Sequence, residues 1–275
     1  MRTARLAGLI AAGAMLLTLA APAFAADKAM VRVLHGSPDA PSVDVFVNDG
    51  KVDALSGLSF GDLSAYAAVP AGTYSIKVCA TADNTVCPIG PVDLTFEAGS
   101  RYTVAASDLL AQIKANVFTD NGKPVDGKAK VKVVHLSADT PAVDVLTQDG
   151  SAKVVTNLAY PDKTGYLALD PGSYDLKVCA NADNTVCPLD PGALKLEGGV
   201  VYSVFAIGSL AGGDGVEGLT AVVGVDNMLA PATDTIGAAS SDSSSGNGLA
   251  LAALVAAGVA ALAFTLRRTA VRVRS

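Results

Sequence analysis

The sequence predicts an all-β protein made of two tandem antiparallel β-sandwich domains of the immunoglobulin-like, Greek-key type. Three observations lead to this prediction. The chain repeats itself at an offset of about 100 residues. Within each repeat, apolar and polar residues alternate over short stretches, as in half-buried strands. Clusters of Gly, Pro, Asn and Asp separate these stretches at the spacing typical of a sandwich. A small barrel is the alternative arrangement.

The internal repeat is direct evidence for two domains. Residues 31–50, VRVLHGSPDAPSVDVFVNDG, align without a gap with residues 131–150, VKVVHLSADTPAVDVLTQDG. Each repeat spans close to 100 residues, a common size for one domain. We therefore place one β-sandwich at 27–122 and the other at 128–227, with a linker at 123–127. Because this linker is short, we expect the two sandwiches to pack end to end with little freedom.

Individual strands show the same alternation in detail. Val31 and Val33 alternate with Arg32, which assigns the arginine to the opposite face of its strand. Tyr74 and Tyr174 each follow a turn and begin a strand. A tyrosine in this position usually packs its ring in the core while its hydroxyl binds a nearby backbone group.

The two ends of the chain predict export and anchoring. Residues 1–25 combine two arginines, an apolar run and the small-residue motif Ala-Phe-Ala, which is typical of a signal peptide, although a retained anchor is an alternative. Residues 228–248 are rich in Ser, Ala, Gly and Asp and predict a flexible stalk. Residues 249–266 are uncharged and long enough for a transmembrane helix, and the arginine-rich tail 267–275 favours a cytoplasmic C-terminus. A buried soluble helix, or a tail removed by a sorting enzyme, are the alternatives.

The charge distribution limits the class of partner. All 26 acidic residues but only 14 of the 20 basic residues lie within 27–246, so this part carries a net charge of −12. Such a surface repels nucleic acid and anionic lipid at long range. We expect no nucleic-acid partner, and an envelope glycan or a surface protein as the partner class.

The four cysteines predict one disulfide in each repeat. They lie in two near-identical segments, VCATADNTVCP and VCANADNTVCP. Seven residues separate the cysteines of a pair, which fits neither a zinc knuckle nor a catalytic C-x-x-C motif. For an exported chain we expect bonds between Cys79 and Cys87 and between Cys179 and Cys187, with pairing across the repeats as the alternative. Because Cys79 shares strand parity with Lys77, the bond should be peripheral.

The segments VRVLHGSPDAPSVDVFVNDG and LSFGDLSAYAAVPAGTYSIKV (58–78) resemble the domain of unknown function 4397, a family of secreted or surface-anchored bacterial domains often found in tandem. The resemblance covers both repeats. It implies a β-sandwich and an extracytoplasmic role, but no activity and no catalytic residues. The second repeat departs from the pattern at Leu136, Ala138 and Asp170.

A histidine and two aspartates recur in each repeat and are the only candidates for a metal or acid/base site: His35, Asp39 and Asp44, and His135, Asp139 and Asp144. His35 shares parity with the apolar residues of its strand, so a structural hydrogen bond to a turn carbonyl or to Asp39 is the preferred interpretation. Ser37 and Ser137 lie near these histidines without a nucleophile-elbow motif. The acidic turns 119–122 and 125–128 are interpreted as plain turns in preference to calcium sites.

These observations predict a non-enzymatic, single-pass membrane protein of the cell surface without a cofactor. Its two domains would act as an adhesion, envelope-binding or spacer module. The alternative is a metal-dependent or glycan-processing surface enzyme that uses the histidine and aspartate cluster.

Overall fold

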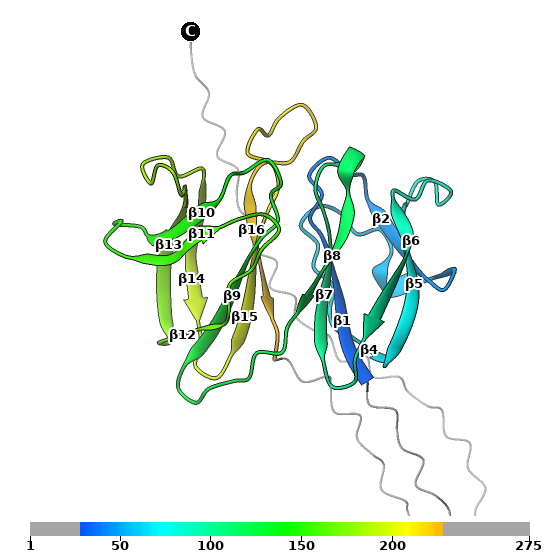
Figure 1. The fold of residues 1–275 in the computed structure, drawn as a ribbon, viewed down its shortest axis with the longest axis horizontal. Coiled ribbons are helices and arrows are strands. Elements are labelled where there is room, and N and C mark those ends of the chain that lie inside the picture. The colour runs from blue at the N-terminus through cyan, green and yellow to red at the C-terminus, as the bar shows by residue number, and fades with distance from the viewer. Residues whose placement is uncertain (1–27, 228–275) are drawn as a thin grey trace, which may run out of the picture. The chain divides into compact units, whose positions relative to one another are not determined.

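The computed structural model describes residues 28–227, which form sixteen β-strands and two short 3-10 turns (Figure 1). This confirms the all-β prediction. Within this range, no helix has the length and apolar character needed to cross a membrane. The predicted signal peptide 1–25, stalk 228–248, membrane helix 249–266 and basic tail 267–275 lie outside the described residues.

Each repeat contains eight strands. The first repeat comprises β1 (Lys28–His35), β2 (Val43–Val47), β3 (Gly50–Lys51), β4 (Ala67–Pro70), β5 (Gly72–Ala80), β6 (Ile89–Phe96), β7 (Arg101–Ser107) and β8 (Lys114–Thr119). The second comprises β9 (Ala129–His135), β10 (Val143–Thr147), β11 (Lys153–Leu158), β12 (Leu167–Leu169), β13 (Gly172–Ala180), β14 (Leu189–Leu196), β15 (Val201–Ile207) and β16 (Thr220–Val225). The 3-10 turns are Asp53–Leu55 and Leu110–Gln112.

The strands of each repeat form two four-stranded sheets. In the first repeat the strand orders are β4-β1-β7-β8 and β3-β2-β5-β6, and in the second they are β12-β9-β15-β16 and β11-β10-β13-β14. Valines and isoleucines from both sheets meet in the core, among them Val33 of β1, Val45 of β2 and Val78 of β5. The sandwich architecture predicted from the alternation is therefore present in both repeats.

One feature of the sheets differs from the purely antiparallel prediction. β1 pairs with β7 in parallel, as β9 does with β15, while the other ladders are antiparallel. The alternation of side chains is the same in parallel and antiparallel strands, so it does not distinguish the two pairings.

The two tyrosines behave as predicted. The Tyr74 hydroxyl donates to the Pro70 carbonyl at 2.8 Å, and the Tyr174 hydroxyl donates to the Asp170 carbonyl at the same distance. The Tyr74 ring lies 6.1 Å from that of Phe96 at one end of the core. Each tyrosine thus fixes the turn that precedes β5 or β13.

The prediction of end-to-end packing is wrong. The β4-β1-β7-β8 sheet of the first repeat packs against the β12-β9-β15-β16 sheet of the second (Figure 1). Arg32 on β1 is only 2% exposed and Lys132 on β9 only 1% exposed. The polar face that strand alternation assigns to these residues is therefore buried by the other repeat.

Both predicted disulfides are present, Cys79–Cys87 and Cys179–Cys187. The prediction that the bond is peripheral needs correction, because Cys79 is 1% exposed. The loop that follows β5 folds back over this cysteine: Asn84 donates to the Ala80 carbonyl at 2.9 Å, and Thr85 is fixed by the Asp83 carboxylate. Strand parity correctly assigned Cys79 to the face of its sheet that points away from the core, but the loop covers that face.

Removing one disulfide should lower stability by a moderate amount. We expect Cys79→Ser combined with Cys87→Ser to reduce the free energy of unfolding by about 2.5 kcal/mol. Without the bond, this short loop is no longer closed in the unfolded chain, which therefore gains conformational entropy. Urea denaturation under oxidising conditions measures this loss. The matched variant Cys179→Ser with Cys187→Ser should give a similar value, and no change in either variant would contradict the prediction.

Candidate functional site

The two histidines occupy equivalent structural positions. His35 is fully buried at the end of β1, with Nε2 at 3.0 Å from the Pro41 carbonyl, and His135 places Nε2 3.3 Å from the Pro141 carbonyl. Since a carbonyl only accepts, each Nε2 carries the proton. Burial lowers the pKa of His135, which favours its neutral form. These contacts confirm the structural interpretation, in which the histidine binds a turn carbonyl.

The environment of the second ring nitrogen differs between the repeats. Nδ1 of His135 accepts a hydrogen bond from the Ser137 amide at 3.3 Å, whereas Nδ1 of His35 is buried without a partner among the described residues. Ser37 instead uses its hydroxyl to donate to the Asp108 carbonyl at 2.7 Å. Neither serine is paired with a histidine as a nucleophile with its base.

Asp39 and Asp139 fix the loop that follows the seventh strand of each repeat. Asp39 accepts from the Leu110 amide at 2.7 Å, and Asp139 accepts from the Leu210 amide at 3.0 Å and from the Ser209 hydroxyl at 2.6 Å. Although burial opposes it, these hydrogen bonds lower the pKa of Asp139. Both carboxylates therefore serve as loop caps.

Asp44 is fully buried and surrounded by donors. Its carboxylate accepts four hydrogen bonds, from Lys51 Nζ at 2.6 Å, Gly57 N at 2.8 Å, Asn84 Nδ2 at 2.9 Å and Thr81 Oγ1 at 3.0 Å. These donors come from β3, from the loop after the first 3-10 turn and from the disulfide loop. The Lys51 hydrogen bond is the main cause of a strongly lowered pKa at Asp44.

Asp144 repeats this arrangement with different donors. It accepts from Lys153 Nζ at 2.7 Å, Asn157 N at 2.8 Å, Asn181 Nδ2 at 2.8 Å and Asn184 Nδ2 at 2.9 Å. Burial would raise its pKa, but the hydrogen bonds outweigh burial and lower it strongly. Each aspartate thus joins its disulfide loop to the neighbouring strands.

The candidate metal ligands do not come together. The histidine and the two aspartates of each repeat bind separate partners. Across residues 28–227, no group of three or more His, Cys, Asp or Glu side chains is placed to hold a metal ion. Lysine ammonium groups occupy one oxygen of Asp44 and one of Asp144, which is where a cation would have to bind.

The lowered pKa values of Asp44 and Asp144 predict how stability depends on pH. A carboxylate whose pKa is lower in the folded state contributes stability that is complete above its unfolded pKa of about 4 and is lost as pH falls through the folded pKa. We therefore expect the thermal unfolding temperature to decrease as the pH is lowered below about 4. The Asp44→Asn, Asp144→Asn variant should be less stable at pH 7 and lose less on acidification. An equally steep acid loss in this variant would contradict the assignment.

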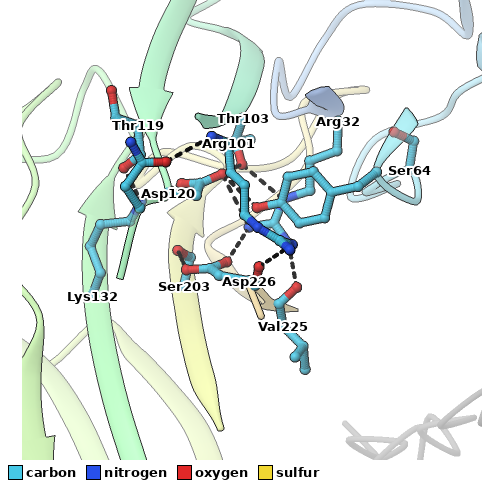
Figure 2. Close-up of polar contacts among 12 residues, drawn as sticks. Arg32, Ser64, Arg101, Thr103, Thr119, Asp120, Lys132, Ser203, Val225 and Asp226 are labelled. Atoms are coloured by element: carbon cyan, nitrogen blue, oxygen red, sulfur yellow. Dashed lines mark hydrogen bonds and ion pairs between the residues drawn. The ribbon is translucent and has the colours of Figure 1, made fainter. Parts of the chain in front are cut away.

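The most extensive polar cluster in the described residues lies between the two repeats (Figure 2). Arg32 of β1 crosses to the second repeat, where its Nη2 lies 2.6 Å from Oδ1 of Asp226 and its Nη1 donates to the Val225 carbonyl at 3.2 Å. Lys132 of β9 makes the reciprocal contact, with the Asp120 carboxylate and with the Thr119 carbonyl at 3.0 Å. Each repeat therefore neutralises a carboxylate of the other.

Each carboxylate is held in place by its own repeat. Asp120 accepts from Thr103 Oγ1 at 2.6 Å and from the Tyr66 hydroxyl at 2.7 Å. Asp226 accepts from Ser203 Oγ and from the Tyr166 hydroxyl, both at 2.6 Å. Arg32, Lys132 and their partners thus form an approximate two-fold arrangement, in which equivalent residues of the repeats have equivalent roles.

The burial of this cluster shifts several pKa values. Burial lowers the pKa of Lys132, although Asp120 opposes the shift. Burial, together with the charge of Asp120, raises the pKa of Asp226. Burial and the adjacent aspartates also raise the pKa of the Tyr66 and Tyr166 hydroxyls, which stay protonated and act as donors. The arrangement can fix the two repeats together, because each buried cation has a carboxylate partner on the other repeat.

Apolar packing lies beside the charges. Its buried members are Leu34, Ala105, Phe118, Val134, Leu136, Phe205 and Ile207, drawn from both repeats. Large and small residues complement each other: Phe118 of β8 corresponds to Gly224 of β16, and Phe205 of β15 corresponds to Ala105 of β7. A Cβ atom at Gly224 would lie 2.5 Å from Nη1 of Arg32. The missing side chain therefore makes room for the arginine.

Comparison with known proteins assigns the family. The family model for the Domain of unknown function (DUF4397) matches residues 29–146 and 146–237. The chain belongs to the DUF4397 family. The match divides at residue 146, inside β10, whereas the structural boundary between the DUF4397 repeats lies between β8 and β9. No curated protein matches the chain.

Several solved structures are similar to this DUF4397 protein at low identity. The C-terminal domain of AlgF from P. aeruginosa is 23% identical, covering 36% of this chain and 99% of that chain, with a TM-score of 0.28. A Bacteroides fragilis protein provisionally described as a cell adhesion protein is 10% identical, covering 74% and 98%, with a TM-score of 0.18. The fimbrial anchor protein Mfa2 from Porphyromonas gingivalis is 9% identical, covering 72% and 99%, with a TM-score of 0.16.

Sequence reasoning missed the residues that join the DUF4397 repeats. It treated Arg32 as the polar face of a strand and the segment containing Asp120 as a plain turn. The signal was present in the repeat alignment, because a basic residue recurs at 32 and 132 and an aspartate recurs at 120 and 226. A charge retained in the middle of an apolar strand in both repeats indicates a buried partner.

Proposed function

We propose that this protein is a non-enzymatic, membrane-anchored surface protein whose two sandwiches form one rigid module. Two ion pairs between the repeats, Arg32 with Asp226 and Lys132 with Asp120, are the main support for this proposal. A tandem of freely jointed domains has no need of reciprocal buried charges. A rigid pair can instead hold a binding surface at a defined orientation.

The placement of the loops supports a presenting role. β16 ends at Val225, whose carbonyl accepts from Arg32, and the carbonyl of the next residue, Asp226, accepts from Arg101 at the beginning of β7. The loops that follow β1, β5 and β7 lie at the opposite end of the strands, as do their counterparts in the second repeat (Figure 1). In this proposal these loops carry the binding surface.

The net negative charge of residues 27–246 limits the class of partner. The acidic balance of residues 27–246 disfavours nucleic acid and anionic lipid, which leaves an envelope glycan or a surface protein as the partner that the loops would meet. In this proposal the N-terminal signal 1–25 is removed on export and the arginine-rich tail 267–275 is cytoplasmic. The protein would act as an adhesion, envelope-binding or spacer module.

Accessibility on intact cells tests this proposal. An epitope tag inserted at Ala82, in the exposed disulfide loop, should be detected by antibody on intact cells expressing the full chain. A tag added after Ser275 should be detected only after permeabilisation. The proposal fails if both tags require permeabilisation. It also fails if the purified protein shows hydrolytic turnover that His35→Ala abolishes in a folded chain.

A further inference from the structure

Each sandwich contains an apolar cavity between its two sheets. The cavity of the first repeat is about 120 Å³ and that of the second about 170 Å³. Most positions that line the first cavity recur in the second, for example Val33 and Val133, or Ala106 and Ala206. Close packing in proteins leaves few voids larger than a water molecule, and the loss of stability grows with cavity volume. The same void retained in both repeats therefore calls for an explanation.

The walls of these cavities consist of hydrocarbon. Valine, leucine, isoleucine, alanine and phenylalanine make up nearly all of the first lining. The two polar side chains in that lining, His35 and Tyr74, direct Nε2 and the hydroxyl to backbone carbonyls. A wall of this kind excludes water, and an apolar cavity of about 150 Å³ is large enough to bind benzene or xenon.

The size difference between the cavities follows from the sequence. Phe96 lines the first cavity, and Leu196 takes the equivalent place in the second, where the smaller side chain leaves more room. Both cavities reach the last strand of their sheet, through Ala115 and Ala221. On the same face of that strand, Val117 is 41% exposed in the first repeat and Val223 is 44% exposed in the second.

The exposed valine indicates where the second cavity opens. Val223 is both exposed and part of the cavity lining, so apolar surface continues from the solvent to the interior between β14 and β16. A hydrocarbon group can enter along this surface while a polar head remains outside.

We propose that each sandwich binds a hydrocarbon group about the size of a benzene ring, such as the end of an aliphatic chain, between its two sheets. The second repeat has the larger site. This site is separate from the inter-repeat contact, whose apolar residues include Ala105 and Val134 on the opposite faces of β7 and β9.

Methyl NMR of the full chain under xenon pressure, and with benzene, tests the proposal. Val33 and Val78 in the first repeat, and Val133 and Val178 in the second, should shift with either probe. Ala105 and Val134 in the inter-repeat core should not. The proposal is overturned if the cavity methyls do not respond, or if Ala105 and Val134 respond equally.

Cavity-filling variants give an internal control. Ala106→Leu should abolish the response to benzene in the first repeat and leave the second unchanged, and Ala206→Leu should do the reverse. If either variant fails to fold, the unmodified chain and the other variant still decide the outcome. 1-Octanol, with its aliphatic chain in the cavity, should compete with benzene, and a lack of competition would rule out the aliphatic-chain assignment.

Discussion

Replacing Asp226 by alanine should lower the free energy of unfolding by about 3–5 kcal/mol, because buried Arg32 would lose its 2.6 Å ion pair and keep only Asp120, at 3.7 Å. Arg32 is only 2% exposed, so water cannot replace the lost ion pair. The same substitution also removes the acceptor of Ser203 and Tyr166. Urea denaturation measures the loss.

Two matched variants make this prediction sharper. Asp120→Ala should cost less than Asp226→Ala, because its partner is a lysine whose pKa burial already lowers and which can become neutral. Asp93→Ala removes an exposed carboxylate and should change stability by less than about 0.5 kcal/mol. If Asp226→Ala cost no more than Asp93→Ala, the ion pair would not hold the repeats together.

The second large effect should come from the apolar part of the contact. Phe205 is fully buried between the repeats, and its ring centroid lies 5.7 Å from Cζ of Arg32. Phe205→Ala should cost about 3–5 kcal/mol, because it removes a large buried ring and leaves a cavity. Thermal and urea denaturation measure this cost.

Phe46 serves as the control for Phe205, because it is also a phenylalanine but is less buried. Phe46 is half-buried on β2, beneath Lys77. Phe46→Ala should therefore cost clearly less than Phe205→Ala. Equal costs would mean that Phe205 contributes no more than a surface ring, which would contradict the packing described here.

The fold within each repeat could be predicted from the sequence because it depends on local patterns. The alternation of Val31, Arg32 and Val33 indicates the two faces of a strand. Tyr74 after a turn indicates a tyrosine that packs its ring in the core and binds the turn through its hydroxyl. The close cysteine spacing likewise predicted the disulfides. These features depend on neighbours along the chain, and the structure confirms them.

The contact between the repeats depends on residues far apart in sequence, which is why it could not be predicted in the same way. Arg32 and Asp226 are separated by 194 positions, and nothing near Arg32 distinguishes a solvated face from one covered by another domain. Likewise, the pattern does not distinguish the parallel pairing of β1 and β7 from an antiparallel one. The recurrence of charge at equivalent positions was the only available sign.

The histidine and aspartate candidates show that closeness in sequence does not make a site. His35, Asp39 and Asp44 are close in sequence and chemically suited to a metal, yet each has its own structural partner. Proximity in sequence does not fix the direction in which a side chain points. Of the two partners expected for His35, a turn carbonyl or Asp39, the structure shows the carbonyl of Pro41.

Amide hydrogen exchange of the full chain measures most directly whether the two repeats form one cooperative unit. If the exchanged ion pairs lock them together, the slowest amides of β7 and β15 should open with the same free energy. Asp226→Ala should then lower both values equally. Different opening free energies in the two repeats, or an effect of Asp226→Ala confined to the second repeat, would contradict the account.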